Sequence, residues 1–300
     1  MLFGDLVHEF LIDCKIRKLS ERTVFLYDRQ LGYFTSYLEN EHNVTTLEDF
    51  KTAHVRAYMM MQQEKGTKPS YINDLIKPIK CLCSYAYQEG YTDTVITRRI
   101  KNVKEPKVLI HTFSSDEITR MIKFFNGKDY LSIRNRLMLM ILFDTGVRIT
   151  ELLSMRESQI RDGYFLIHGK GNKERVVPLS PIVSKFMIKY NSERTLYFSF
   201  RDAEDYYFLS KNGKRLTNEA VAKFMKEAAK AVGVNPLVRV SPHTCRHTFA
   251  QQSLKNGLDL YSLSRLLGHE SVTITQRYLE GIRDEQILHA VKGTGVLSHL

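Results

Sequence analysis

A basic, proline-containing stretch near residue 100 divides the sequence into two parts and is the feature that most constrains the fold. Residues 98–111 contain Pro106 and five cations, carry Glu105 as their one acidic residue, and show no helical period. A chain of 300 residues is long enough for two domains with separate hydrophobic cores. We therefore predict a helical domain over 1–97, a basic linker over 98–111 and a second domain over 112–300. The linker cations are Arg98, Arg99, Lys101, Lys104 and Lys107.

The first part contains four segments with the apolar spacing of amphipathic helices. Residues 2–18 carry apolar side chains at i, i+3, i+4 and i+7, and a second segment begins after Ser20, a good N-cap. A third helix is predicted to follow Thr46, with Asp49 as its capping partner, and to stop at Gly66. A fourth is predicted from about residue 70 to residue 88. Together they predict a small all-helical domain.

The second part mixes helical and strand patterns. Ser114 opens a helix with capping chemistry, and an apolar helix is predicted to end at Gly146. Two β-prone runs, 164–167 and 175–179, flank a Gly-Lys-Gly turn, which is a hairpin signal. The predicted fold class is therefore mainly α, with an α+β second domain that holds a small antiparallel sheet. Further helices are predicted over 182–190, 217–232, 242–256, 260–267 and 272–279.

The charge of the chain is strongly positive and unevenly distributed. The sequence has 44 Lys and Arg against 33 Asp and Glu, a net charge of +11. Residues 1–111 contribute +2 and residues 112–300 contribute the other +9. Nucleic acid suits such a charge, but on charge alone a membrane surface, an acidic partner or no polyanion at all stay open.

Several classes of protein are excluded by what the sequence lacks. No stretch approaches the roughly 18 to 20 apolar residues of a membrane span, so we expect no membrane association. The N-terminus carries acids where a signal peptide has positive charge, which predicts a cytoplasmic location. The four cysteines form no Cys-x-x-Cys pair, which argues against a disulfide framework or a zinc ribbon.

Two familiar cofactor motifs fail on inspection. Gly163 and the Gly-Lys pair at Lys170 stand one residue too far apart for a phosphate-binding P-loop, and Gly171 occupies the magnesium-binding Ser/Thr position. His243 and His247 are four apart on a predicted helix, but no Glu follows His243 and no third metal ligand is placed. We therefore expect neither a cofactor nor a metal.

What remains is a set of polar residues at unusual places in apolar helices. Arg148 follows the glycine break at the start of a helix, and His243 and Arg246 share one face near another helix N-terminus. His269 follows a helix that ends in glycine, and Tyr278 comes nine residues later. Taken singly, Arg148 is better explained by a surface pair with Glu151, and Tyr278 by a place in the core or at its rim. Together these residues supply charge and proton donors for a phosphate without a carboxylate cluster for magnesium, so the attacking group must come from the protein.

The order of these motifs resembles the tyrosine recombinase (phage integrase) family, in particular its short Xer-like members. The resemblance spans residues 145–278. It implies a SAM-like core-binding domain before the linker and a catalytic domain after it. The motifs are Thr-Gly-Val-Arg148-x-x-Glu151-Leu, His-Gly-Lys170-Gly-Asn-Lys-Glu-Arg, His243-x-x-Arg246-His247, and Leu-Gly-His269 followed by Tyr278.

The resemblance also implies a role for each residue. Tyr278 is the nucleophile that attacks the scissile phosphate and forms a 3′-phosphotyrosyl bond without ATP. Arg148 and Arg246 clamp the phosphate oxygens, and His269 hydrogen-bonds the same phosphate. Lys170 protonates the leaving 5′-oxygen, with Lys173 as its rival in the same hairpin. His243 is the acid/base partner of the tyrosine, while Glu151 and His247 orient their neighbours.

The implied partner is a double-stranded DNA recombination site bound by a homotetramer, alone or with a related recombinase, through a Holliday junction. Lys173, Arg175 and the linker cations are the expected DNA contacts, and residues 282–300 are expected to pack on a neighbouring protomer or to close their own domain. The alternatives are a type IB topoisomerase and a DNA-binding protein without activity. Integration, excision, transposition and dimer resolution use the same pocket, so the biological task stays open.

Overall fold

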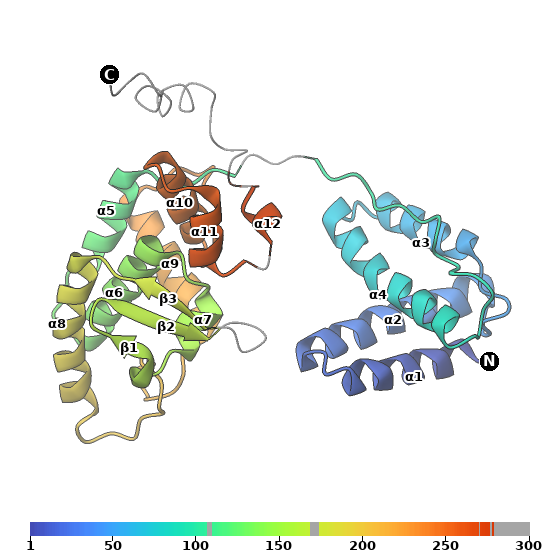
Figure 1. The fold of residues 1–300 in the computed structure, drawn as a ribbon, viewed down its shortest axis with the longest axis horizontal. Coiled ribbons are helices and arrows are strands. Elements are labelled where there is room, and N and C mark those ends of the chain that lie inside the picture. The colour runs from blue at the N-terminus through green and yellow to red at the C-terminus, as the bar shows by residue number, and fades with distance from the viewer. Residues whose placement is uncertain (107–109, 169–173, 270, 277, 279–300) are drawn as a thin grey trace. The chain divides into compact units, whose positions relative to one another are not determined.

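The computed structural model describes residues 1–106, 110–168, 174–269, 271–276 and 278, and the chain forms two compact units (Figure 1). The units are Met1–Lys107 and Val108–Leu300, so the division lies within the predicted linker. Among the described residues, no helix is long and apolar enough to cross a membrane.

Four helices build the N-terminal unit around an aromatic core. Phe3, Phe34 and Phe50 meet edge to face, with ring centroids 5.1 to 6.1 Å apart. Ser20 caps the second helix by accepting a hydrogen bond from the backbone N–H of Thr23, as the sequence predicts. The helices are α1 (Phe3–Ile16), α2 (Glu21–His42), α3 (Thr52–Glu64) and α4 (Pro69–Gln88).

The predicted start of the third helix is wrong. Thr46 and Asp49 do bond each other, but they close a turn, and α3 begins only at Thr52. The backbone here is extended because it pairs with the N-terminus: the Phe3 N–H donates to the Thr45 carbonyl at 2.8 Å. A tertiary contact with the chain terminus therefore overrides the local capping signal.

The first part of the predicted linker belongs to the N-terminal unit. Ile100 is buried in the core of that unit. The Asn73 side chain also accepts from the Val103 N–H at 2.8 Å and donates to the Val103 carbonyl at 3.0 Å. Lys107 lies outside the described residues. The other four cations of the stretch, Arg98, Arg99, Lys101 and Lys104, are exposed.

The C-terminal unit contains a three-stranded antiparallel sheet in the order β1-β2-β3. β2 (Tyr164–His168) and β3 (Glu174–Pro178) form the predicted hairpin, with Phe165 opposite Val177, and its turn lies outside the described residues. β1 (Ile160–Arg161) was not predicted, because two residues are too few to show the strand period. The mainly helical fold class with a small antiparallel sheet is confirmed.

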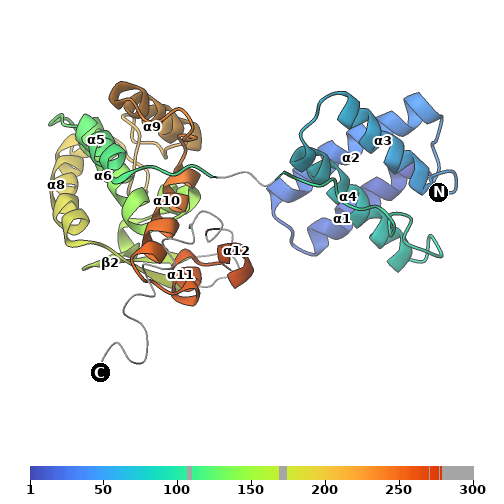
Figure 2. The same cartoon turned by 90° about the horizontal axis from the view of Figure 1, so that it is seen from above.

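Helix α6 (Tyr130–Thr145) forms the centre of this unit. It is buried on nearly every side, which explains the apolar run of its sequence, and it ends at Gly146 in the left-handed conformation, as predicted. In Figures 1 and 2, α10, α11 and α12 lie together. The other helices are α5 (Ser115–Phe124), α7 (Ile149–Ser154), the short 3-10 helix Glu157–Gln159, α8 (Pro181–Phe198), α9 (Asn218–Val232), α10 (Pro242–Lys255), α11 (Leu260–Leu267) and α12 (Val272–Gln276).

Candidate active site

A cleft of about 1280 Å³ in the C-terminal unit collects the candidate catalytic residues that the structure describes. They come from the N-terminus of α7, from α10, and from the segments that follow α11 and α12. Residues separated by up to 130 positions in the sequence therefore face one opening. The candidates that line the cleft are Arg148, His243, Arg246, His269 and Tyr278.

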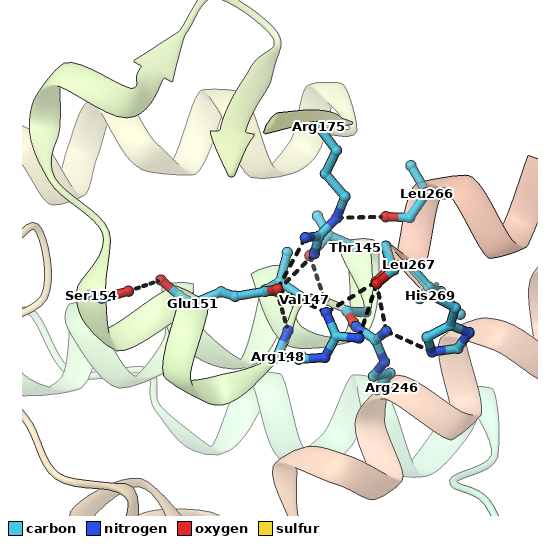
Figure 3. A network of polar contacts seen from close by, with 12 residues as sticks. Thr145, Val147, Arg148, Glu151, Ser154, Arg175, Arg246, Leu266, Leu267 and His269 are labelled. Carbon is cyan, nitrogen blue, oxygen red and sulfur yellow. Dashed lines mark hydrogen bonds and ion pairs between the residues drawn. The ribbon is translucent and has the colours of Figure 1, made fainter. Parts of the chain in front are cut away.

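The carboxyl end of α11 holds both candidate clamp arginines (Figure 3). The Leu267 carbonyl accepts from Arg246 Nη2 at 2.7 Å and from Arg148 Nη1 at 3.4 Å, and the Gly268 carbonyl accepts from Arg148 Nη2 at 3.1 Å. The last carbonyls of a helix lack partners within the helix and carry the negative end of its dipole. They can therefore hold two guanidinium groups side by side without cancelling their full positive charges.

Glu151 supports Arg148 from the other side. Its carboxylate accepts from the backbone N–H of Arg148 at 2.8 Å and from Nη1 at 3.0 Å. Burial by itself would raise the pKa of Glu151, but hydrogen bonds and charge from Arg175 and Arg148 hold that pKa below its ordinary value. The pair with Glu151 and the place in the cleft are thus compatible: the Arg148 side chain keeps 41% of its surface exposed.

Arg246 is almost completely buried. Its Nη1 donates to the Gly146 carbonyl at 2.7 Å, which connects it to the end of α6. Burial and the neighbouring charge of Arg148 lower the pKa of Arg246 to about 10, so the guanidinium remains charged near neutral pH. A buried cation of this kind is well prepared to bind an anion, because little water has to leave it.

The hydrogen bonds of His269 define its protonation in this state. Arg246 Nη2 lies 2.9 Å from Nε2 of His269. A guanidinium can only donate, so Nε2 accepts this bond and the ring carries its proton on Nδ1. The Nδ1 atom lies 2.8 Å from the hydroxyl of Thr275, which is fully buried. Thr275 therefore fixes the orientation of the ring.

Tyr278 lies between two histidines. Its ring centroid is 5.0 Å from that of His247 and 6.1 Å from that of His269, and its side chain is buried. His247 in turn contacts His243, with 3.0 Å between their Nε2 atoms. One of these nitrogens donates and the other accepts, so a hydrogen bond joins the two rings. The imidazole of His247 thus lies beside the ring of Tyr278 and contacts His243 in turn.

Several predicted site residues lie outside the described residues or have another environment than expected. Lys170, Lys173 and the tail at 282–300 lie outside the described residues. Arg175, which we expected to contact DNA, has a side chain only 11% exposed and forms an ion pair with Glu151. No group of three His, Cys, Asp or Glu side chains that could hold a metal occurs within the described part of the chain.

Sequence reasoning missed three further residues near the cleft. Arg215 and Arg265 line it, and Thr275 supports His269. The position of Thr275 three residues before Tyr278, within one helical turn, was the signal available for it. No local signal marks Arg215, because its place depends on a bond from Nε to the Leu153 carbonyl at 3.1 Å.

Comparison with known proteins agrees with this geometry. Residues 111–282, more than half of the chain, match the phage integrase family. The chain belongs to that family. A tyrosine recombinase XerD of Oceanobacillus iheyensis is 31% identical over 266 residues, which cover 87% of this chain and 88% of the relative. The protein is accordingly a site-specific tyrosine recombinase. These matches favour recombination over the topoisomerase alternative.

Solved structures share the fold of this recombinase. The XerH site-specific recombinase bound to a palindromic difH substrate, in a post-cleavage complex, matches with a TM-score of 0.75 and 20% identity. That match covers 89% of this chain and 79% of the XerH chain. A lambda integrase tetramer bound to a Holliday junction matches with a TM-score of 0.71 and 18% identity, covering 95% of this chain and 78% of the integrase chain.

Proposed function

We propose that this recombinase cleaves DNA by attack of Tyr278 on a phosphodiester that Arg148, Arg246 and His269 bind in the cleft. The observation that carries the proposal is the convergence of these three side chains on the end of α11, with the tyrosine ring beside His269. A phosphate placed there meets two guanidinium groups.

The two arginines supply the electrostatic stabilisation. Each guanidinium has N–H groups to offer the non-bridging oxygens, and the charge that builds up on the pentacoordinate phosphate is neutralised in a largely desolvated pocket. Because backbone carbonyls hold both groups in place, little reorganisation accompanies the reaction. No metal ion is required for this part of the chemistry.

His269 changes its hydrogen bonds when the phosphate arrives. A phosphate oxygen replaces Nε2 as the acceptor of the Arg246 N–H, and the ring then carries its proton on Nε2 and donates it to the phosphate. The hydroxyl of Thr275 can donate as well as accept, so it supports Nδ1 in both states.

Cleavage exchanges one bond to phosphorus for another and moves two protons. The Tyr278 oxygen bonds to phosphorus, the bond from phosphorus to the 5′-oxygen breaks, and Lys170 protonates that oxygen. His243 takes the tyrosine proton, with His247 holding it in position. The products are a 3′-phosphotyrosyl bond and a free 5′-hydroxyl, and the reverse steps rejoin the strand. Lys173 is the alternative acid.

The DNA partner is a double-stranded recombination site bound by a homotetramer, alone or with a related recombinase. The exposed cations Arg98, Arg99, Lys101 and Lys104 support contact with the phosphate backbone. Strand exchange passes through a Holliday junction, and residues 282–300 pack on the neighbouring protomer.

Covalent capture tests the nucleophile and identifies the site. The protein is incubated with fragmented DNA of its source genome and denatured with detergent, and the DNA ends joined to it are sequenced. We expect one recurrent sequence, linked through its 3′-phosphate. Tyr278→Phe should capture nothing, whereas Tyr261→Phe, an exposed tyrosine on α11, should behave as the wild type. Capture by Tyr278→Phe would refute the assignment.

Arg148→Gln separates cleavage from binding. We expect cleavage of the captured site to be abolished and DNA affinity to fall only modestly, because many phosphate contacts share the affinity. If Arg148→Gln lost its affinity for DNA and still cleaved the DNA that it bound, that result would contradict the role of Arg148.

A further inference from the structure

We propose that Arg175 is a positioning residue for DNA cleavage: it couples the β2–β3 hairpin to the phosphate clamp through Glu151 and the end of α11. This inference rests on the proposed function, since it concerns how the clamp is held. It replaces our expectation that Arg175 contacts DNA.

The guanidinium of Arg175 is engaged at all three of its nitrogens. Nη1 and Nη2 donate to the two carboxylate oxygens of Glu151, at 3.0 and 2.7 Å, in a bidentate pair. Nε donates to the Leu266 carbonyl at 2.9 Å. Both partners of the ion pair are nearly buried, with 11% and 10% of their side-chain surfaces exposed. This geometry leaves little of Arg175 for a DNA phosphate.

Three arginines donate to the last two carbonyls of α11 and to the carbonyl of its cap residue, Gly268. Leu266 accepts from Arg175, Leu267 from Arg246 and Arg148, and Gly268 from Arg148 (Figure 3). The helix end is thus a common support, and a shift at one carbonyl moves the others. Since β3 carries Arg175, the hairpin strand that leads from Lys170 is tied to the same support.

The charge of Arg175 also matters for the clamp. The Glu151 carboxylate is shared by Arg148 and Arg175. Without Arg175, the full negative charge of Glu151 would face Arg148 alone and offset the positive charge intended for the phosphate. Arg175 therefore keeps the clamp net positive while Glu151 still orients Arg148.

The packing around Gly268 agrees with this role. A methyl group at Gly268 would lie 2.9 Å from Arg175 Nη1 and 3.1 Å from its Cδ. The absence of a side chain lets the guanidinium lie directly against the backbone, and φ of +65° favours glycine in addition. Both properties of Gly268 serve the contact between Arg175 and the helix end.

The first test compares Arg175→Gln with the wild type on a nicked duplex carrying the captured site. At saturating protein, we expect the single-turnover cleavage rate to fall roughly 100-fold, as displacements near 1 Å can cause, while DNA affinity changes about threefold or less. Arg161→Gln removes an exposed arginine from the same sheet and should keep the wild-type rate. Equal losses of rate and affinity in Arg175→Gln, or an unchanged rate, would overturn the proposal.

A double-mutant cycle with Glu151→Gln tests the electrostatic route. Once the carboxylate is neutral, Arg175→Gln should reduce the rate far less, by only a few-fold on the scale of coupled neighbours. Independent, multiplicative losses would show that Arg175 does not act through Glu151. Arg175→Lys keeps the charge but cannot form the bidentate pair, so we expect its cleavage rate to lie between the rates of the wild type and of Arg175→Gln. If the glutamine variant does not fold, Arg175→Lys carries both tests.

A measurement without DNA distinguishes this inference from the proposed function. The carboxyl pKa of Glu151, followed by carbon NMR during an acid titration, should rise in Arg175→Gln and not in Arg161→Gln. If the pKa of Glu151 rises in Arg175→Gln but the wild type captures no DNA, the recombinase mechanism is refuted and the coupling through Arg175 is supported. If the pKa of Glu151 is unchanged and the wild type captures DNA normally, only the coupling through Arg175 is refuted.

Discussion

Gly146→Ala tests whether the end of α6 is as tightly packed against the site as the structure shows. Gly146 has φ of +60°, and an added methyl carbon would lie 2.5 Å from Cδ1 of Phe249 and 3.1 Å from Cδ2 of Leu267. Its carbonyl also accepts the bond from Arg246. The substitution therefore adds a backbone penalty and a steric clash at one point.

The loss of stability expected for Gly146→Ala has two separate contributions. The left-handed conformation costs alanine about 1 to 2 kcal/mol relative to glycine. Overpacking of a filled site adds about 1 to 3 kcal/mol. Gly233 ends α9 with nearly the same conformation, φ of +66°, but faces open space, so Gly233→Ala should carry only the first contribution. The difference between the two variants isolates the clash.

Calorimetry of the full-length variants measures this difference. For a unit of this size, about 1 kcal/mol shifts the melting temperature by roughly 2 to 4 °C. The C-terminal transition of Gly146→Ala should thus lie about 2 to 12 °C below that of Gly233→Ala. Equal melting temperatures would refute the packing argument, and a normal cleavage rate in Gly146→Ala would refute the role of its carbonyl in holding Arg246.

Three further outcomes are expected. Thr275→Val should slow single-turnover cleavage about tenfold without changing DNA affinity, because His269 Nδ1 loses its partner, whereas a wild-type rate would contradict the tautomer scheme. Because the pKa of Glu151 is lowered in the folded protein, the ionised carboxylate stabilises the fold above pH 4.5, its ordinary pKa. This contribution is lost as the pH falls through the folded-state pKa. The stability deficit of Glu151→Gln measured at neutral pH should therefore shrink as the pH of the melts falls below 4.5, and a constant deficit would argue against this contribution. Affinity for duplex DNA should fall roughly 10³-fold or more between 50 and 200 mM salt, and binding insensitive to salt would exclude the backbone contacts.

The sequence alone determined those features that depend on short-range chemistry. Ser114 and Glu117 form the expected capping box, and Gly146 and Gly233 end helices as glycines at C-caps do. The order of the motifs also identified the family, and with it the five candidates that line the cleft, which are Arg148, His243, Arg246, His269 and Tyr278. Helix periods, caps and motifs can be read locally because each involves residues within a few positions of one another.

The tertiary structure decided how these residues are held. Pairing with the chain terminus moved the start of α3, and the ion pair with Glu151, 24 positions away, took Arg175 out of the expected DNA surface. Carbonyls at the end of α11 hold arginines from as far as 120 positions away. A backbone carbonyl is present at every residue, so no side-chain pattern marks the ones that accept these bonds, and only folding brings donor and acceptor together.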